Sequence, residues 1–461
     1  MSLPSVARAG VAVATNRRSL PLPRSFAFIT ARDVSFVIGL LGAIVGAMWI
    51  RHGGLGRDPL TAVGEVTALV GTYAALVGVL FMARAPWLDQ VFGADRLRSI
   101  HRIVGFLSVW ALAAHAMFST LAYADGALGD VVPTVVSLVE TVPGMLGAIV
   151  SMGLFGLVAV TSIRAARRRL SYESWHGIHL YIYLAVALGF LHQIAMGQDF
   201  VDDPLARWFW IGLYVAAFLP LILHRVVSPI AFTLRHRPRV AAIEPEADGI
   251  FSLYVVGRDF DEIAVRAGQF FVIRALTGRD WTHGHPFSIS AAPNGRSLRF
   301  TIKELGQGTR ALRALRPGTP LLLEGPYGAM HGERRTGRPV VFIAGGIGIA
   351  PIRAMAEAFG YDAGGADLVY RARTPGEAAL RRELELLAAY RGMRLHMIVG
   401  PRGSFGVDAD PLGPESLAHL VPDLANRDAF ICGPDNLMEH ARRSLRAIGV
   451  ADSRIHLELF G

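Results

Sequence analysis

The stretch that decides the fold is HRIVGFLSVWALAAH, residues 101–115. Its two terminal histidines enclose an apolar segment in which only Arg102 is charged. At 100° per residue, fourteen positions bring a helix back to within about 40° of its starting direction, over a rise of about 21 Å. His101 and His115 are therefore expected on one face of one helix, toward opposite sides of a membrane. Because an imidazole inside a membrane is costly, both histidines indicate a functional site.

Apolar blocks of similar length recur through the first half of the chain. Each approaches the roughly 20 residues that cross a bilayer. A hydrophobic share of 52% and a mean hydropathy of +0.39 agree with a membrane domain. After about residue 235 the pattern changes to short alternating runs with Gly and Pro turns, which indicates a soluble half. The six blocks cover about 34–50, 62–83, 100–122, 142–163, 175–196 and 207–230.

Charge is distributed unevenly between the loops that join these blocks. The intervening loops are acidic or poor in positive charge, whereas arginines gather in alternate loops, at residues 84–98, 164–169 and 225–239. The positive-inside rule then places both termini and the soluble half in the cytoplasm, with residues 1–33 as a cytoplasmic N-terminal segment. This asymmetry accounts for the net charge of +9. We therefore expect membrane lipid as a partner, and no nucleic acid.

The fifth block repeats the histidine pattern, with His179 and His192 thirteen positions apart. Four imidazoles at two depths form two pairs, His101 with His179 and His115 with His192. A planar macrocycle held by an imidazole on each face is a b-type haem, so the sequence predicts two haems.

Two features of the fifth block stay open. The inner ligand is either His179 or His176, which lies three residues earlier. Thirteen residues also leave His192 about 140° from His179 on an ideal helix. The block must therefore be locally tightened or bent, for example at Gly189, or the two haems must be approached from different sides.

The soluble half divides into two patterns. Short strands with turn signals follow one another up to about residue 330, which is typical of a small antiparallel barrel. Strands and helices then alternate, which predicts a parallel sheet. We expect a multi-domain chain: a six-helix transmembrane bundle over 34–232, an antiparallel β-barrel over 236–334 and an α/β domain over 338–461.

A glycine-rich turn opens the α/β domain at VVFIAGGIGIAP, residues 340–351. Its glycines allow the backbone to approach a pyrophosphate at a helix N-terminus. A later strand ends in Cys432, Gly433 and Pro434, at the carboxyl edge where nucleotides bind in such sheets. Cys432 is the only cysteine in the chain, which excludes a disulfide framework and cysteine-ligated metal clusters.

At this point the chain resembles a known family. HPFSIS at 285–290, GGIGIAP at 345–351, the CGP after a strand and the aromatic Phe460 resemble the ferredoxin–NADP reductase superfamily. Joined to a six-span domain with two histidine pairs, they resemble the ferric reductase and NADPH oxidase family over roughly residues 34–461. The resemblance implies an enzyme that binds FAD in the barrel and NADPH in the α/β domain.

The resemblance also implies site residues. The FAD-binding residues would be His285, Pro286, Phe287, Ser288, Ile302, Lys303, Gly308 and Thr309. The nucleotide-binding residues would be Gly345, Gly346, Gly348, Pro351, Cys432 and Gly433. The residues at the hydride-transfer site would be Ser288 near the flavin N5, Cys432, Glu458, and Phe460 stacked on the flavin.

The choice of nucleotide depends on YRART, residues 370–374. Arg371 and Arg373 stand where a carboxylate would hold the ribose diol of NADH, and arginine suits a 2′-phosphate. NADPH is therefore expected, and NADH remains an alternative. Lys303 is the only lysine among 46 basic residues, which suggests a site that requires a compact ammonium.

The expected activity is transfer of electrons from cytosolic NADPH through FAD and two haems to ferric iron or oxygen, giving Fe(II) or superoxide. Superoxide-producing members of the family carry another histidine one turn beyond the outer ligand, where this chain has Ser119. Arg51 resembles the family's arginine near the outer haem. Two alternatives remain: an electron donor to an extracytoplasmic redox protein, and a non-catalytic haem–flavin sensor.

Overall fold

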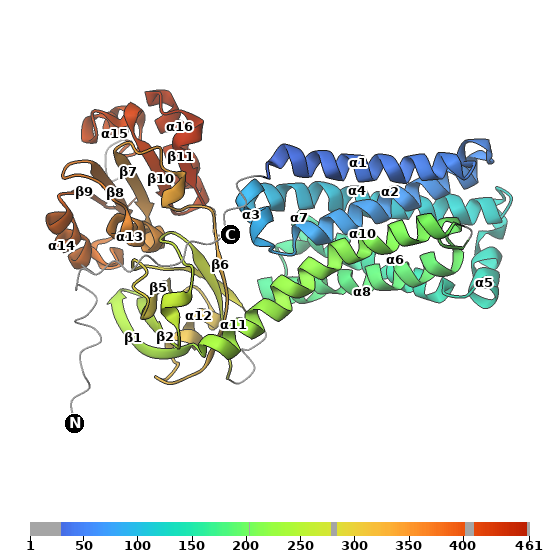
Figure 1. The fold of residues 1–461 in the computed structure, drawn as a ribbon, viewed down its shortest axis with the longest axis horizontal. Helices are drawn as coiled ribbons and strands as arrows, with labels where there is room; N and C mark the ends of the chain where they lie inside the picture. Colours follow the sequence, from blue (N-terminus) through green and yellow to red (C-terminus); the bar gives the residue numbers. More distant parts are fainter. Residues whose placement is uncertain (1–28, 202, 278–283, 402–409, 459–461) are drawn as a thin grey trace. The chain divides into compact units, whose positions relative to one another are not determined.

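The computed structural model describes residues 29–201, 203–277, 284–401 and 410–458 (Figure 1). Its contacts divide the chain between Val226 and Val227 into a membrane unit and a soluble unit. The sequence places the corresponding boundary at residues 232–236.

The membrane unit contains, among the described residues, six helices long and apolar enough to cross a bilayer. The predicted six-helix bundle is therefore confirmed. The helices are α1 (Ala31–Arg51), α2 (Pro59–Phe81), α4 (Ala94–Tyr123), α6 (Met145–Ser162), α8 (Tyr172–Met196) and α10 (Pro204–Ile222). The last continues through a π turn, Leu223–Val227, into α11 (Ser228–His236), which begins the soluble unit.

Polar caps explain where several of these helices begin. The Asp58 carboxylate accepts hydrogen bonds from the first free backbone N–H groups of α2, and Asp203 does the same for α10. Each is followed by a proline at the first helical position, where no N–H is needed. The loops also contain short helices that the sequence does not predict: α3 (Pro86–Phe92), α5 (Val131–Thr141), α7 (Arg164–Arg167) and α9 (Gln198–Val201).

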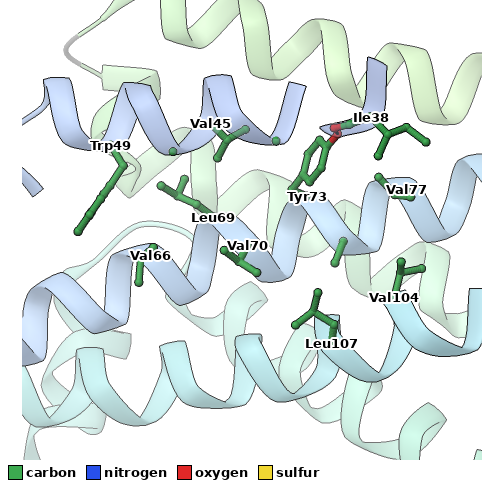
Figure 2. A pocket seen from close by; sticks show the side chains of 13 residues that line it. Ile38, Val45, Trp49, Val66, Leu69, Val70, Tyr73, Val77, Val104 and Leu107 are labelled. Carbon is green, nitrogen blue, oxygen red and sulfur yellow. Dashed lines mark hydrogen bonds between the residues drawn. The ribbon is translucent and has the colours of Figure 1, made fainter. Parts of the chain in front are cut away.

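An apolar cavity of about 260 Å³ lies among α1, α2 and α4 (Figure 2). Trp49 and Tyr73 stand along it, and the Tyr73 hydroxyl donates to the Ile38 carbonyl at 2.5 Å. None of the four predicted haem histidines lines this cavity, so it is separate from the site considered below.

The first part of the soluble unit consists of two three-stranded antiparallel sheets, in the orders β1-β2-β5 and β4-β3-β6. An isolated bridge between Ile289 and Phe300 links the two sheets. A short helix, α12 (Gln307–Arg313), connects the last two strands. The strands are β1 (Arg239–Ala247), β2 (Ile250–Val256), β3 (Phe270–Ala275), β4 (His285–Ser288), β5 (Ser297–Lys303) and β6 (Leu321–Tyr327).

The second part is a five-stranded parallel sheet in the order β11-β10-β7-β8-β9. Chain order reverses beside β7, so the carboxyl ends of β7 and β10 form the topological switch point where ligands bind in open α/β sheets. The strands are β7 (Val340–Gly345), β8 (Ala366–Ala372), β9 (Arg394–Val399), β10 (Asp428–Cys432) and β11 (Ile455–Leu457). The helices are α13 (Ile349–Ala358), α14 (Arg381–Arg391), α15 (Pro414–Leu420) and α16 (Asp435–Ile448).

The two parts of the soluble unit share one hydrophobic core. Phe271 and Ile289 of the antiparallel sheets belong to the same buried cluster as Phe342 and Met355 of the parallel sheet and its helix. The two parts are therefore packed as one body, and contacts between them can position ligands.

Candidate functional site

The first histidine pair lies between α4 and α8. The His101 and His179 rings have centroids 6.0 Å apart and meet at 70°. Trp175 packs against His179 at 5.1 Å. Of the two candidates on α8, His179 is therefore the residue that faces His101, rather than His176.

The second pair joins the same two helices further along. His115 lies fourteen residues beyond His101 on α4, and His192 lies thirteen residues beyond His179 on α8. On α8, the Nδ1 atoms of His179 and His192 are buried and find no hydrogen-bond partner among the described residues. A buried ring nitrogen without a partner carries a desolvation cost, so hydrogen bonding through Nδ1 does not account for these two histidines inside the bundle.

Backbone carbonyls orient the two histidines of α4. The Nδ1 of His101 donates to the Gly78 carbonyl at 3.2 Å, and the Nδ1 of His115 donates to the Gly64 carbonyl at 2.9 Å. Since Nδ1 carries the proton in both rings, Nε2 is left as the nitrogen that can bind a metal. This is the arrangement of a metal-bound imidazole whose second nitrogen is held by a backbone carbonyl. The residues therefore fit a haem, which these imidazoles would hold through Nε2.

A third bond lies midway between these two. The Ser108 hydroxyl, buried on α4, donates to the Gly71 carbonyl at 2.9 Å. The acceptors on α2 thus recur every seven residues, at Gly64, Gly71 and Gly78, as do the donors on α4. We call this row of three bonds the α2–α4 seam. Small residues let helix backbones approach closely in a membrane.

The α2–α4 seam was not predicted, although the sequence carries a signal for it. A glycine recurs every seven residues within one apolar block, and the serine lies seven residues from each histidine. That recurrence indicates a close helix contact. Only the structure shows that the glycine carbonyls accept from the histidine rings.

A similar serine joins α6 to α8. The Ser151 hydroxyl donates to the Ala185 carbonyl at 2.7 Å. A Cβ added at Gly189 would lie 3.4 Å from the Ser151 hydroxyl oxygen. Gly189 is therefore a packing position. α8 is a continuous α-helix from Tyr172 to Met196, with no 3₁₀ or π turn at Gly189, and whether it bends there or the haems are approached from different sides stays a prediction.

An ionic cluster stands at the end of the bundle that holds His115. Arg51, which is 63% exposed, contacts Asp203 at 3.3 Å, and the His52 Nε2 lies 3.1 Å from the same carboxylate. The hydrogen bond from His52 and the Arg51 charge hold the pKa of Asp203 below its usual value. Next to Gly64, Glu65 accepts from the Trp49 indole at 3.1 Å and pairs with Arg57.

In the soluble unit, two predicted FAD motifs meet. His285 begins β4 and lies directly over Gly308, where an added Cβ would stand 2.2 Å from its Nε2. Ser288 ends β4, is 8% exposed, and pairs with Phe270 in the register of β3. The Thr309 hydroxyl accepts from the Leu305 and Gly306 N–H groups at 3.0 and 3.1 Å, which shapes the turn before α12.

The other predicted FAD residues differ in how deeply they are buried and in what they contact. Ile302 is buried in β5, Phe287 is half-buried against the core, and Pro286 is exposed. The Lys303 ammonium pairs with Glu377, which follows β8, at 3.3 Å. The single lysine therefore joins the two parts of the soluble unit.

The backbone of the glycine loop, residues 345–348, packs directly against the backbone at the end of β10. Gly346 has φ +53, in the left-handed region that favours glycine. A Cβ on Gly348 would lie 2.2 Å from the Cys432 carbonyl oxygen, and one on Gly433 would lie 3.1 Å from Gly345. The predicted nucleotide residues thus converge at the switch point. Pro351 is buried in the first turn of α13, directly behind them.

Cys432 and Glu458 lie side by side at this edge. Burial, together with the nearby Glu458 carboxylate, raises the pKa of the Cys432 thiol, so the thiol stays protonated. Glu458 is 7% exposed and lies over Gly328, where a Cβ would stand 2.8 Å from its carboxylate oxygen. Gly328 was not predicted as a site residue. Phe460 lies outside the described residues.

The two arginines predicted to bind the 2′-phosphate differ: Arg371 lies within β8, and Arg373 follows the strand. The Arg371 guanidinium donates to the carbonyls of Ala372, Ile398 and Pro401, so backbone oxygens already surround it. Arg373 is exposed just beyond the strand. Of the two predicted 2′-phosphate ligands, Arg373 is therefore the one presented to solvent.

Family models match both halves of the chain. The model described as "Ferric reductase like transmembrane component" matches residues 67–190, which contain His101, His115 and His179 and end two residues before His192. In this part the chain is similar to the ferric reductase family. The model described as "Oxidoreductase NAD-binding domain" matches residues 342–443, which contain the glycine loop and Cys432. The chain thus joins a ferric-reductase-like transmembrane component to an oxidoreductase NAD-binding domain.

Curated relatives match part of the chain. A flavohemoprotein of Chromobacterium violaceum is 31% identical over 243 residues, which cover 48% of this chain and 60% of the relative. A flavohemoprotein of Pseudomonas aeruginosa is 31% identical over 234 residues, which cover 49% and 58%. The chain thus spans less than two thirds of the length of these relatives. A solved FAD/NAD-binding domain of a nitric oxide dioxygenase from Vibrio cholerae is 22% identical, covering 49% and 99%, with a TM-score of 0.40.

Proposed function

We propose that this chain, as a member of the ferric reductase family, moves electrons from cytosolic NADPH, through FAD and two b-type haems, to ferric iron or oxygen on the other side of the membrane. The observation that carries the proposal is the facing pair of His101 on α4 and His179 on α8, with a second histidine further along each helix and both α4 imidazoles held by glycine carbonyls. The chemistry that FAD and haem supply when bound is acceptance of a hydride and its onward release as single electrons.

In the membrane unit, His101 and His179 would hold one haem, and His115 and His192 the other. The glycine carbonyls of α2 keep Nδ1 protonated on His101 and His115, which orients each ring and raises its basicity as a ligand. Ser108, between them, fixes the register of α2 against α4.

In the soluble unit, Gly345, Gly346 and Gly348 would receive the NADPH pyrophosphate at the start of α13. The neutral Cys432 thiol and the Glu458 carboxylate would border the nicotinamide, and Ser288 would lie near the flavin N5. Phe460 would cover the flavin face. The arginine-rich alternate loops support a cytoplasmic position for this unit.

The acceptor can be tested directly with purified protein carrying FAD and haem. We expect steady NADPH oxidation with a ferric chelate under anaerobic conditions, with formation of Fe(II). If oxygen is instead the acceptor, reduction of an added reporter in air will be abolished by superoxide dismutase. A protein that stays reduced and turns over with neither acceptor would contradict the proposal and favour a sensor or a donor to a partner protein.

Arg373→Glu should discriminate between the two nucleotides. Charge reversal repels the 2′-phosphate of NADPH, and NADH lacks that group. We expect the KM for NADPH to rise by about tenfold or more relative to that for NADH, a difference of roughly 1.4 kcal/mol. Steady-state kinetics with both nucleotides provide the measurement, with Arg443→Glu, an exposed arginine of α16, as the control. Equal losses with both nucleotides would place the phosphate elsewhere.

A further inference from the structure

A buried cluster of charges joins the flavin-side sheets to the nucleotide domain. Arg299 of β5 donates through Nη1 to both carboxylate oxygens of Glu383 on α14, at 2.8 and 3.1 Å. Arg353 of α13 pairs with the same carboxylate from its other side. The side chains of the two arginines are 6% and 3% exposed, and that of Glu383 is 19% exposed. The carboxylate on α14 therefore bridges two buried guanidinium groups, one on β5 and one on α13.

The same arginines hold the segment that follows β4 and leads out of the predicted flavin site. Ser290 lies two residues beyond Ser288 and is fully buried. The Arg299 Nε donates to its hydroxyl at 3.1 Å and Nη2 to its carbonyl at 2.5 Å. The Arg353 Nη1 donates to that carbonyl at 3.3 Å.

The cluster is also fixed to the start of α13. Arg353 lies in the second turn of α13, immediately after the glycine loop, and pairs with Glu357 one turn further on. The Glu357 carboxylate accepts from the Ala292 N–H at 2.6 Å, which is again on the flavin side. Breaking one partner of a buried ion pair is strongly destabilising locally, because it leaves an uncompensated charge. The cluster is therefore a stiff link between Ser288 and the nucleotide loop.

We propose that the Arg299–Glu383–Arg353 cluster positions the nicotinamide against the flavin and so sets the rate of hydride transfer. This rests on the proposed function, because it assumes that FAD and NADPH bind at the two ends of the link. None of the three residues touches the reacting atoms. They act as positioning residues through Ser290 on one side and through α13 on the other.

Glu383→Gln tests this, since it removes the bridging charge and keeps an oxygen acceptor. We expect flavin reduction by NADPH, followed by stopped flow, to slow by roughly 10- to 100-fold, the effect of an ångström-scale misplacement of reacting atoms. The primary isotope effect with 4-deuterated NADPH should rise, because hydride transfer becomes more limiting. NADP⁺ affinity and the flavin content should change by less than about threefold, since the groups that bind each ligand are untouched.

Glu385→Gln is the matched control. It is the same substitution two residues away on α14, where the carboxylate is 51% exposed and pairs with Arg381. If the Glu383→Gln protein loses its flavin, Arg353→Lys is the variant to test instead. Lysine keeps the positive charge but lacks the guanidinium group that reaches Ser290, Glu357 and Glu383. An unchanged rate and isotope effect per bound flavin in the tested variant would overturn the inference. Failure of the unmodified protein to oxidise NADPH would instead overturn the proposed function.

Discussion

Replacing His115 by alanine should halve the haem content of the purified protein, from two haems per chain to one. The variant removes the Nε2 that would bind one haem and leaves the His101 and His179 pair intact. Loss of a hydrogen-bond partner of a metal ligand typically lowers activity by roughly 10- to 100-fold. Loss of the ligand itself should lower electron delivery to an external acceptor by more than that. Flavin reduction by NADPH should continue, because its residues lie in the separate soluble unit. The pyridine haemochrome assay measures the ratio.

Ser119→Ala is the control for this result. Ser119 lies one turn beyond His115, with its hydroxyl 3.2 Å from the His115 Nδ1, but the Gly64 carbonyl already accepts from that nitrogen. The control should therefore keep two haems. A ratio near one in the unmodified protein would contradict the assignment of His115 and His192 as a second haem pair.

Much of the fold could be predicted because its signals are long. Each membrane helix extends over some twenty residues of one composition, and the strand–helix alternation of the nucleotide domain repeats several times. Strand β1 was not predicted. Its segment contains Glu244, Pro245 and Glu246, residues that are depleted in strands, and the register shifts after Pro245. Pairing with β2 outweighs this local preference.

The sites could be predicted only in part. Residue type and helical spacing were enough to single out four histidines, but the choice of His179 over His176 depends on which ring faces α4. The contact of His285 with Gly308, and that of Glu458 with Gly328, joins segments far apart in the chain. The role expected for Arg371 depended on residue type alone, and three backbone carbonyls surround its guanidinium.

The polar groups that orient the site residues left the weakest trace in the sequence. A carbonyl acceptor carries no side-chain signature, so the recurrence of Gly64, Gly71 and Gly78 indicates a close helix contact but not the hydrogen bonds to the histidines. Arg299, Arg353 and Glu383 were equally inconspicuous in a chain with 46 basic residues. Each becomes informative only when burial and partners are known.

The α2–α4 seam makes the second large-effect prediction, for Gly71→Val. An added Cβ at Gly71 would stand 2.8 Å from the Leu112 Cγ and 3.1 Å from the Leu112 backbone nitrogen. The leucine side chain can rotate, whereas the backbone of α4 can yield only by moving away. Valine adds two methyl groups beyond that Cβ, so α2 and α4 must separate. Overpacking of this kind typically costs about 1–3 kcal/mol.

Separation of the two helices should affect both haem pairs together, because the Gly64 and Gly78 carbonyls lie on α2 and their imidazole donors on α4. We expect Gly71→Val to lose most of both haems, with flavin content unchanged in the soluble unit, and Gly71→Ala to lose a smaller share. Gly105→Val is the matched control on α4, where nothing stands within 4 Å of an added Cβ. Haem and flavin absorbance of the detergent-purified variants provide the measurement. Full haem content in Gly71→Val, with the control also intact, would show that the histidines are positioned without the α2–α4 seam.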